Sequence, residues 1–501
     1  MKKSKLAIGF VALLAIGYVG SSWYVGNKIE KELDSQLINI NETINGYQNQ
    51  YDISIKTSNY QKNIFTSKFH LTITEKPRIE YDVNEPKTVF DDDITIHHGP
   101  FPMAALIKGN FVPQLAWIEY EMTEKDNPTL WKLAGDKPFI TATMGIKFSD
   151  YVVTKITTKA LNTIDMPQFK EGIDISEGNI TITSDLNELT SSMSIKLDKL
   201  RYKIDQVSSI SLSNLKVNLE NKGDDIVDLN SNVDTLTINA RSSLPVQIDI
   251  DNISSSAQYT ITFDPINGAN IPNYQSKMNI EKLKTTVLSF NPQAPFVFNN
   301  IFFKQDVRSN PNNSTEGSYE ANIESFNFGK QNLGHGEFKF NFEGVNTQNP
   351  FESLFIEQNA SDFSKIQWDG LLNWHNAAGD IIANTSAIVD NNLSTDDNNN
   401  DITPDRMLSY NIQIPFKVLA RMWAQTENYN ETDVTDDMIA GKLYMINLIA
   451  KSKIKDHPLI SIDEDKQGIY MDLKIKQSDS DVIINGQKMN KNDFNRLIFS
   501  L

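Results

Sequence analysis

The chain has 501 residues, of which 39% are hydrophobic, and this is enough to bury a substantial core. It carries 47 basic and 64 acidic residues, and a surface with a formal net charge of −17 repels phosphate backbones. We therefore expect no nucleic-acid partner. Cysteine is absent, which excludes disulfide frameworks, thiolate metal sites and thiol nucleophiles.

The N-terminus predicts a membrane anchor. Residues 1–5 hold three lysines, and the 21 residues from Leu6 to Gly26 carry no charge. As a helix at about 1.5 Å per residue this stretch measures about 31 Å, which is enough to cross a bilayer core. Trp23 and Tyr24 lie at its far end, where aromatic rings favour the membrane–water boundary. The lysines place the short tail 1–5 in the cytoplasm, so the rest of the chain is expected on the opposite side of the membrane.

A cleaved signal peptide is the alternative reading of this segment. Small residues that a signal peptidase would recognise occur at Val19-Gly20-Ser21. The apolar stretch is, however, longer than the roughly 7–15 residues of a typical signal-peptide core. We therefore assign residues 6–26 to a transmembrane helix.

A second helix is predicted directly after the anchor, over residues 27–46. Its apolar residues recur every three or four positions, at Ile29, Leu33, Leu37, Ile40 and Ile44. Such an amphipathic helix is either a stalk packed on the following domain or a helix that pairs with a partner or lies on the membrane surface.

Residues 47–501 are predicted to form a β-rich region. From Tyr51 the apolar period changes to two, and the alternation becomes insistent between residues 175 and 345. The apolar positions of the predicted strands are Ile53, Ile55, Phe65, Phe69, Leu71, Ile73, Ile180, Ile182, Met193, Ile195, Leu197, Ile210, Leu212, Leu215, Val217, Leu219, Val233, Leu236, Ile238, Tyr259, Ile261, Phe263, Phe338, Phe340 and Phe342. The fold class is therefore mainly β (α+β), an extended antiparallel meander or curved sheet with a few helices, mostly near the C-terminus.

Two helices and a closing hairpin are predicted late in the chain. One helix follows Pro415, and a longer one begins after Thr435 as N-cap. Asn485-Gly486 predicts a tight turn between the last strands. The Asn- and Asp-rich segment 390–401 is expected to be an exposed loop, since it lacks the glycine and distal glutamate of a helix–loop–helix calcium site.

The sequence offers no catalytic, cofactor-binding or metal-binding residues. Its histidines lack the HExxH spacing, and no GxSxG, Walker A or GxGxxG motif occurs. His97-His98 is the one histidine pair, but adjacent strand residues point to opposite faces, so a structural role is expected. We interpret Gly99-Pro100 as the end of a strand from Ile94, with Phe101 folding back to anchor the turn.

The chain resembles the YdgA-like family of bacterial proteins. The resemblance is carried by the anchor running into Trp23-Tyr24-Val25-Gly26, by Tyr60-Gln61-Lys62-Asn63-Ile64-Phe65, by His98-Gly99-Pro100-Phe101-Pro102, and by Val482-Ile483-Ile484-Asn485-Gly486. It implies a protein of the cell inner membrane that faces the periplasm and has no established reaction.

Two classes of function remain open. The first is an envelope protein that acts as a binding or structural module, with a homo-oligomer as its expected form. The second is lipid handling, in which an apolar β-groove guides acyl chains. The aromatic set Phe338, Phe340 and Phe342 is read either as one face of a sheet core or as a surface for an apolar ligand. An enzyme is the third alternative, and no cofactor is expected.

Overall fold

The computed structural model describes residue 41 and most of residues 51–498. The described ranges are 41, 51–62, 66–78, 85–98, 101–149, 151–164, 166, 171–185, 190–205, 207–223, 226–241, 245–264, 269–289, 294–309, 314–346, 365–390, 405–453, 459–463, 467–476 and 479–498. The predicted anchor, residues 6–26, lies outside them, as does the predicted helix 27–46 apart from Asn41. None of the helices in these ranges is long and apolar enough to span a bilayer.

The described residues form 24 strands, and neighbouring strands pair antiparallel. The prediction of a mainly β fold with few helices is therefore confirmed. The chain divides into two compact units. Unit 1 comprises Met1–Asp205 and Ser213–Asp224, and unit 2 comprises Gln206–Leu212 and Asp225–Leu501.

Unit 1 begins with a meander in which each strand pairs with the next one along the chain. Its strands are β1 (Tyr51–Lys62), β2 (Thr66–Pro77), β3 (Lys87–His98), β4 (Ala116–Glu121), β5 (Ile140–Ile146) and β6 (Tyr151–Thr158). Alternate residues of these strands bury one apolar face, which forms the core of the unit around Ile73, Ile94 and Ile96. The predicted antiparallel pair at the start of the β-rich region is thus confirmed as β1 and β2.

The rest of unit 1 continues the antiparallel pairing with two short helices between strands. The remaining strands are β7 (Leu161–Asn162), β8 (Gly172–Ile175), β9 (Gly178–Asp185) and β10 (Thr190–Lys203), and β11 (Ser209–Asn221) contributes residues to both units. β9 pairs with β6 and β10, while β8 pairs with β7 and β10. Helices α3 (Met103–Ile107) and α4 (Pro128–Leu133) were not predicted, because each is only five or six residues long.

The side chain of Asn41 binds the backbone of β1. Its side-chain amide donates to the Ile55 carbonyl at 3.0 Å, and the Ile55 N–H donates to the Asn41 Oδ1 at 2.8 Å. The amide thus satisfies both backbone groups of Ile55, as a neighbouring strand would.

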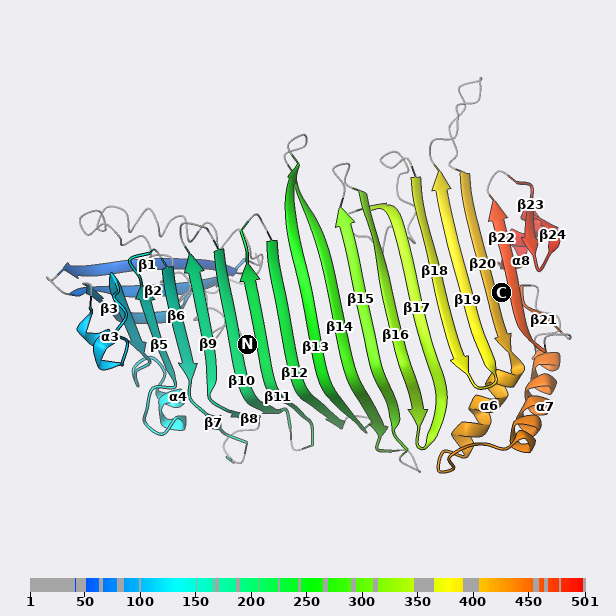
Figure 1. The fold of residues 1–501 in the computed structure, drawn as a ribbon, viewed down its shortest axis with the longest axis horizontal. Helices are drawn as coiled ribbons and strands as arrows, with labels where there is room; N and C mark the ends of the chain where they lie inside the picture. The colour runs from blue at the N-terminus through cyan, green and yellow to red at the C-terminus, as the bar shows by residue number, and fades with distance from the viewer. Residues whose placement is uncertain are drawn as a thin grey trace, which may run out of the picture. The chain divides into compact units, whose positions relative to one another are not determined.

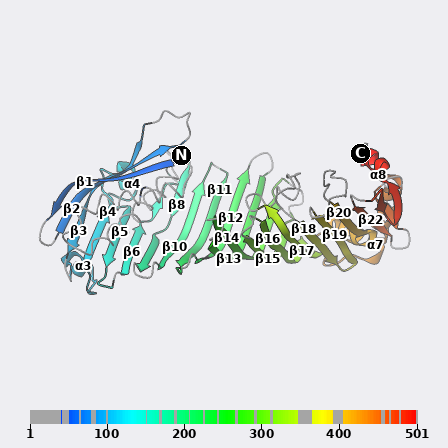
Figure 2. The ribbon, with the colours of Figure 1, turned by 90° about the horizontal axis from the view of Figure 1, so that it is seen from above.

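Unit 2 is a longer meander whose strands follow one another side by side in chain order (Figure 1). They are β12 (Ile226–Arg241), β13 (Pro245–Asp264), β14 (Ala269–Val287), β15 (Phe296–Ser309), β16 (Ser314–Phe328), β17 (Gln331–Asn346), β18 (Lys365–Asn376), β19 (Gly379–Asp390), β20 (Asp405–Pro415) and β22 (Gly468–Lys476). Seen from above, β12–β19 form a single layer (Figure 2).

The C-terminal part of unit 2 adds helices and short strands. These are α6 (Phe416–Glu427), α7 (Asp436–Lys453), β21 (Ser461–Asp463), β23 (Asp481–Ile484), β24 (Gln487–Asn490) and α8 (Lys491–Ile498). The two predicted helices are confirmed, and the Thr435 hydroxyl caps α7 by accepting from the Met438 N–H at 3.3 Å. The predicted hairpin is confirmed as β23–β24, with Asn485 and Gly486 at φ +49° and +78°. Residues 391–401 of the predicted loop lie outside the described ranges.

Candidate functional site

The alternation along β12–β19 gives unit 2 one apolar face. Residues directly opposite in an antiparallel pair project from the same face, so the register assembles rows that run from strand to strand. Two rows are Val233, Ile253, Ile280, Ile301, Ile323, Gly336, Trp374 and Ile381, and Ser231, Ser255, Met278, Phe303, Ala321, Phe338, Leu372 and Ala383. The next two are Leu229, Ala257, Ser276, Gln305, Tyr319, Phe340, Gly370 and Thr385, and Val227, Tyr259, Tyr274, Val307, Gly317, Phe342, Trp368 and Ala387. These four rows hold no charged residue.

In several strands of this face, the alternation of apolar and polar residues is interrupted at the same level of the sheet. We call this level the bend. The apolar residue after Ile280 is Leu283, and the one before Ile301 is Phe298, so the step is three residues instead of two. Asn252 and Asn300 occupy the step in β13 and β15 with left-handed φ values of +51° and +48°. Their side-chain amides donate to the Glu281 and Glu324 carboxylates of the next strands. Because facing strands take the step at the same level, the register from β12 to β16 is unchanged across it.

Ring contacts confirm that the apolar face continues through this bend. Phe298 stacks on Phe326 with ring centroids 4.5 Å apart, and Phe326 meets the edge of Trp374 at 5.8 Å. Trp374 belongs to the row above the bend, and its indole lies against Gly336, where a Cβ would approach the ring to 2.6 Å. The rows above and below the bend therefore form one surface.

Part of this apolar face is exposed. Tyr259, Met278, Phe338 and Leu372 are 38%, 36%, 39% and 46% exposed. Seven strand steps of about 4.8 Å and three row steps of about 6.8 Å give the four rows a footprint of about 700 Å². Soluble monomers rarely expose contiguous apolar patches of more than a few hundred Å², and larger ones mark binding sites. Burial within the face raises the pKa of Tyr319, which stacks on Phe342.

Helices close two borders of the face. α8 places Phe494 against Leu473, in a cluster that includes Tyr410 and so covers β20 and β22. At the β16–β17 turn, Tyr429 beyond the end of α6 packs on Phe328 with ring centroids 5.8 Å apart. Between these borders, Tyr259, Met278, Phe338 and Leu372 stay partly exposed in the part of the chain that the structure describes.

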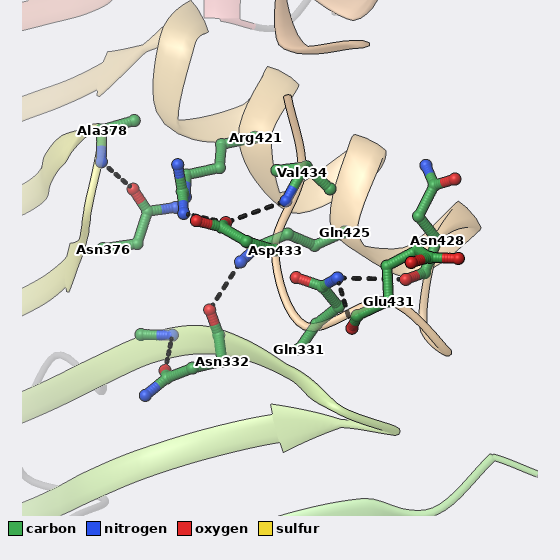
Figure 3. Close-up of polar contacts among 11 residues, drawn as sticks. Gln331, Asn332, Asn376, Ala378, Arg421, Gln425, Asn428, Glu431, Asp433 and Val434 are labelled. Carbon is green, nitrogen blue, oxygen red and sulfur yellow. Dashed lines mark hydrogen bonds and ion pairs between the residues drawn. The ribbon is translucent and has the colours of Figure 1, made fainter. Parts of the chain in front are cut away.

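Buried polar side chains hold α6 in place (Figure 3). The Gln331 amide donates to the carbonyls of Asn428 and Glu431 at 3.0 and 2.9 Å, and the Gln425 amide donates to the Asn332 carbonyl at 2.7 Å. Asn376 likewise donates to the Val418 carbonyl at 3.4 Å. These bonds join both end regions of α6 to the turns of the neighbouring strands.

The opposite, polar face of unit 2 has a shallow groove of about 870 Å³ at the bend. Its lining includes the two bend asparagines, Glu281, Glu324 and the His335–His375 pair, whose ring centroids are 4.9 Å apart. The amide–carboxylate pairs bond to each other, and the His375 Nδ1 lies 2.5 Å from an Asp380 carboxylate oxygen. Because their polar groups are used within the sheet, we assign these residues to the structure of the bend.

The structure places His97 and His98 at the end of β3, opposite Trp117 and Ala116 of β4. β3 begins at Lys87, seven residues before the predicted start at Ile94. Gly99 and Pro100 lie outside the described residues. The prediction that Phe101 folds back to anchor the turn is wrong, because its side chain is 52% exposed. Within the described ranges, no three His, Asp or Glu side chains gather as a metal site would require.

The sequence pattern predicted part of the apolar face and missed the rest. The Phe338–Phe342 set was identified, and the structure places it on β17 in three of the four rows of the face. The rows on β14, β15 and β16 were missed, because the three-residue step breaks the period of two, and β18 was missed although Trp368, Gly370, Leu372 and Trp374 alternate without a step. A search for two alternating segments separated by such a step would have found Ile280 with Leu283 and Ile323 with Phe326.

Comparison with known proteins gives relatives of unassigned activity. Protein YdgA of Escherichia coli (strain K12) is 28% identical over 193 residues, which are 37% of this chain and 36% of YdgA. The uncharacterized protein YihF of the same strain is 22% identical over 532 residues, covering 98% of each chain. An uncharacterized protein of Haemophilus influenzae is 31% identical over 117 residues, which are 23% of this chain and 30% of that protein. The match to YdgA thus spans about a third of its length.

No solved structure matches the chain. A family model described as "Bacterial protein of unknown function (DUF945)" matches residues 1–355, which is more than half of the sequence. The chain therefore belongs to this family of bacterial proteins of unknown function, as the resemblance to YdgA-like proteins implied.

Proposed function

We propose that this protein binds lipid acyl chains on the apolar face of unit 2, while residues 6–26 anchor it in the inner membrane with its β-rich region in the periplasm. The observation that carries the proposal is the uncharged, half-exposed face that runs over β12–β18. Each methylene group of an acyl chain that leaves water contributes about 0.8 kcal/mol. A lipid tail is the ligand that gains most from such a surface.

The continuity of the rows supports a path along which acyl chains move. Neighbouring strands place apolar side chains opposite one another, so a lipid tail meets similar surroundings at each strand. The absence of charge in the four rows avoids the cost of burying an unpaired ion beside the tail. Among the described residues, the contacts of α8 and of Tyr429 after α6 lie at the borders of the face.

Two adjacent leucines of β18 allow a matched test. Leu372 lies on the apolar face opposite Phe338, whereas Leu371 lies on the polar face opposite Lys339. In full-length protein extracted in detergent, native mass spectrometry should detect retained lipid. Leu372→Glu should weaken the lipid affinity about tenfold, equivalent to about 1.4 kcal/mol of binding free energy, and so lower the lipid-bound fraction. Leu371→Glu should leave the lipid-bound fraction close to that of the unmodified protein.

Equal lipid retention in both variants would contradict the proposal, as would lipid-free unmodified protein.

The second candidate function is a binding module that acts as a homo-oligomer. It is favoured by α7, whose Tyr444, Met445 and Leu448 are exposed while Ile439 packs toward α6. The same spectra report stoichiometry, and a lipid-free dimer would favour this second candidate.

A further inference from the structure

Apolar side chains are exposed at one edge of unit 1. Phe101, Met103, Ile107, Phe111, Val112 and Phe148 are 52%, 69%, 80%, 72%, 51% and 50% exposed. We call these six residues the apolar cap. They lie on and around the short helix α3, beside β3 (Figure 1). Ala105 is the buried residue of that helix and attaches it to the unit.

The strand register brings the parts of the apolar cap to one edge. His98, the last residue of β3, pairs with Ala116, the first residue of β4. Ala116 also pairs with Ile146, the last residue of β5. The segment 101–112 and the turn that contains Phe148 therefore leave the sheet at the same place.

The cap has a defined conformation. The Gly109 and Asn110 N–H groups donate to the carbonyls of Leu106 and Ala105 at 3.0 and 2.9 Å, and Gly109 takes φ +77° to end the helix. The exposed side chains are thus presented by an ordered turn. Two lysines flank them: Lys108 pairs with Glu121 at 3.0 Å, and Lys147 lies 4.7 Å from the Tyr151 ring centroid.

We propose that the apolar cap inserts into the interfacial region of the lipid bilayer. Apolar and aromatic side chains on a protruding turn, with lysines beside them, suit the boundary between acyl chains and headgroups. The inference rests on the proposed membrane anchor and adds a second point of contact to it. A protein partner fits the cap less well, because a stable interface takes about 20–30 residues a side and the cap offers six side chains.

The length of chain between the predicted anchor and Asn41 supports a bilayer as the occupant. The predicted anchor ends at Gly26, and Asn41 is bonded to Ile55 of β1. The 15 residue steps between them measure about 22 Å as a helix and at most about 50 Å extended. Unit 1 is therefore tethered close to the membrane surface, where its apolar cap meets lipid at high local concentration.

The lack of cysteine permits a direct test with the full-length chain. Ile107→Cys, labelled with an environment-sensitive fluorophore, is reconstituted into liposomes of phosphatidylethanolamine and phosphatidylglycerol. Lys155→Cys, an exposed position on β6, is the matched control. The label at position 107 should emit at shorter wavelength, and lipids with a spin label near the headgroup should quench it at least twofold more than the label at position 155.

Two results would overturn the proposal. One is equal, weak quenching at both positions in protein that floats with the liposomes. The other is a blue-shifted label at position 107 without lipid quenching, together with cross-linking between copies, which would assign the cap to a second copy of the chain. Protein that does not float with the liposomes would instead show that the anchor fails, so the two failures are distinguishable.

Discussion

His70 on β2 bridges two aspartates of β3. Its Nε2 lies 2.8 Å from the Asp91 carboxylate, and its Nδ1 lies 2.8 Å from that of Asp93. A neutral imidazole has one N–H, so donation to both carboxylates requires the protonated ring. The hydrogen bonds to Asp93 and Asp91 raise the pKa of His70, and the bond from His70 lowers the pKa of Asp91.

This bridge predicts a pH-dependent stability. Because the pKa of His70 is higher in the folded than in the unfolded state, its stabilisation is complete below the ordinary histidine pKa of 6.5 and is lost as the pH rises through the raised pKa. His70→Gln should therefore lower the melting temperature of the full-length protein by about 1–3 °C at pH 5.5 and by less at pH 9. The Asp91 carboxylate sets the lower limit, since its stabilisation is lost as the pH falls through its lowered pKa.

The control removes the charges that His70 contacts. In an Asp91→Asn, Asp93→Asn background, His70→Gln should change the melting temperature equally at both pH values, because no carboxylate remains to favour the imidazolium. A difference between the two pH values that survives in this background would assign the effect to another group.

At the scale of the element, the sequence predicted those strands and helices in which apolar residues recur at one constant spacing. Ile180, Ile182, Met193 and Ile195 alternate without interruption and form β9 and β10 as predicted. The bend was not predictable in the same way, because its cause is a pairing between strands. Asn300 adopts a left-handed conformation beside the Glu324 carboxylate, and no local pattern specifies that partner.

The apolar cap was missed for a different reason. Phe101 was expected inside the turn, since large aromatic residues near Gly and Pro often anchor one. Which side of a turn faces solvent depends on the strands around it, here β4 and β5. The N-cap residue of α3 is Pro102, which makes no side-chain capping bond, so the sequence lacks a signal for the start of this helix. Short helices fixed by tertiary contacts carry little local signal.

The bend asparagines predict a graded response to substitution. Asn300→Ala places a Cβ-bearing residue without a local side-chain hydrogen bond in the left-handed region and removes the bond to Glu324, so unfolding should become easier by about 1–3 kcal/mol. Asn300→Gly removes only the bond and should cost about half as much. Thermal melting followed by tryptophan fluorescence, with Trp374 near the bend, measures both.

Asn322 is the matched control for this series. It lines the same polar groove on β16, but its backbone is not left-handed. Asn322→Ala should therefore change the melting temperature little. A loss as large as that of Asn300→Ala would show that the groove surface, and not the left-handed conformation, stabilises the bend.

At the scale of the whole molecule, the net charge and the apolar surface have opposite effects on contact with a bilayer. A net charge of −17 disfavours broad contact with an anionic bilayer, because like charges repel over about 8–10 Å at physiological ionic strength. Contact through a small apolar cap, whose six residues carry no charge, avoids most of that repulsion. An acidic protein that works beside a membrane is expected to confine its lipid contacts in this way.

The predicted anchor, if it inserts as expected, places the apolar face and the apolar cap on the periplasmic side of the membrane. A reporter that is active only in the periplasm, fused after Asn45, should be active and should stay in the membrane fraction after an alkaline wash, because an uncharged stretch of 21 residues is long enough to span the bilayer. Replacing Leu13 and Leu14 with arginine should abolish that insertion, since each charge at the centre of a span costs about 2.5–3.5 kcal/mol. Release of an active, soluble fusion shortened near Val19–Ser21 would identify a signal peptide, and contact with the bilayer would then depend on the apolar cap alone.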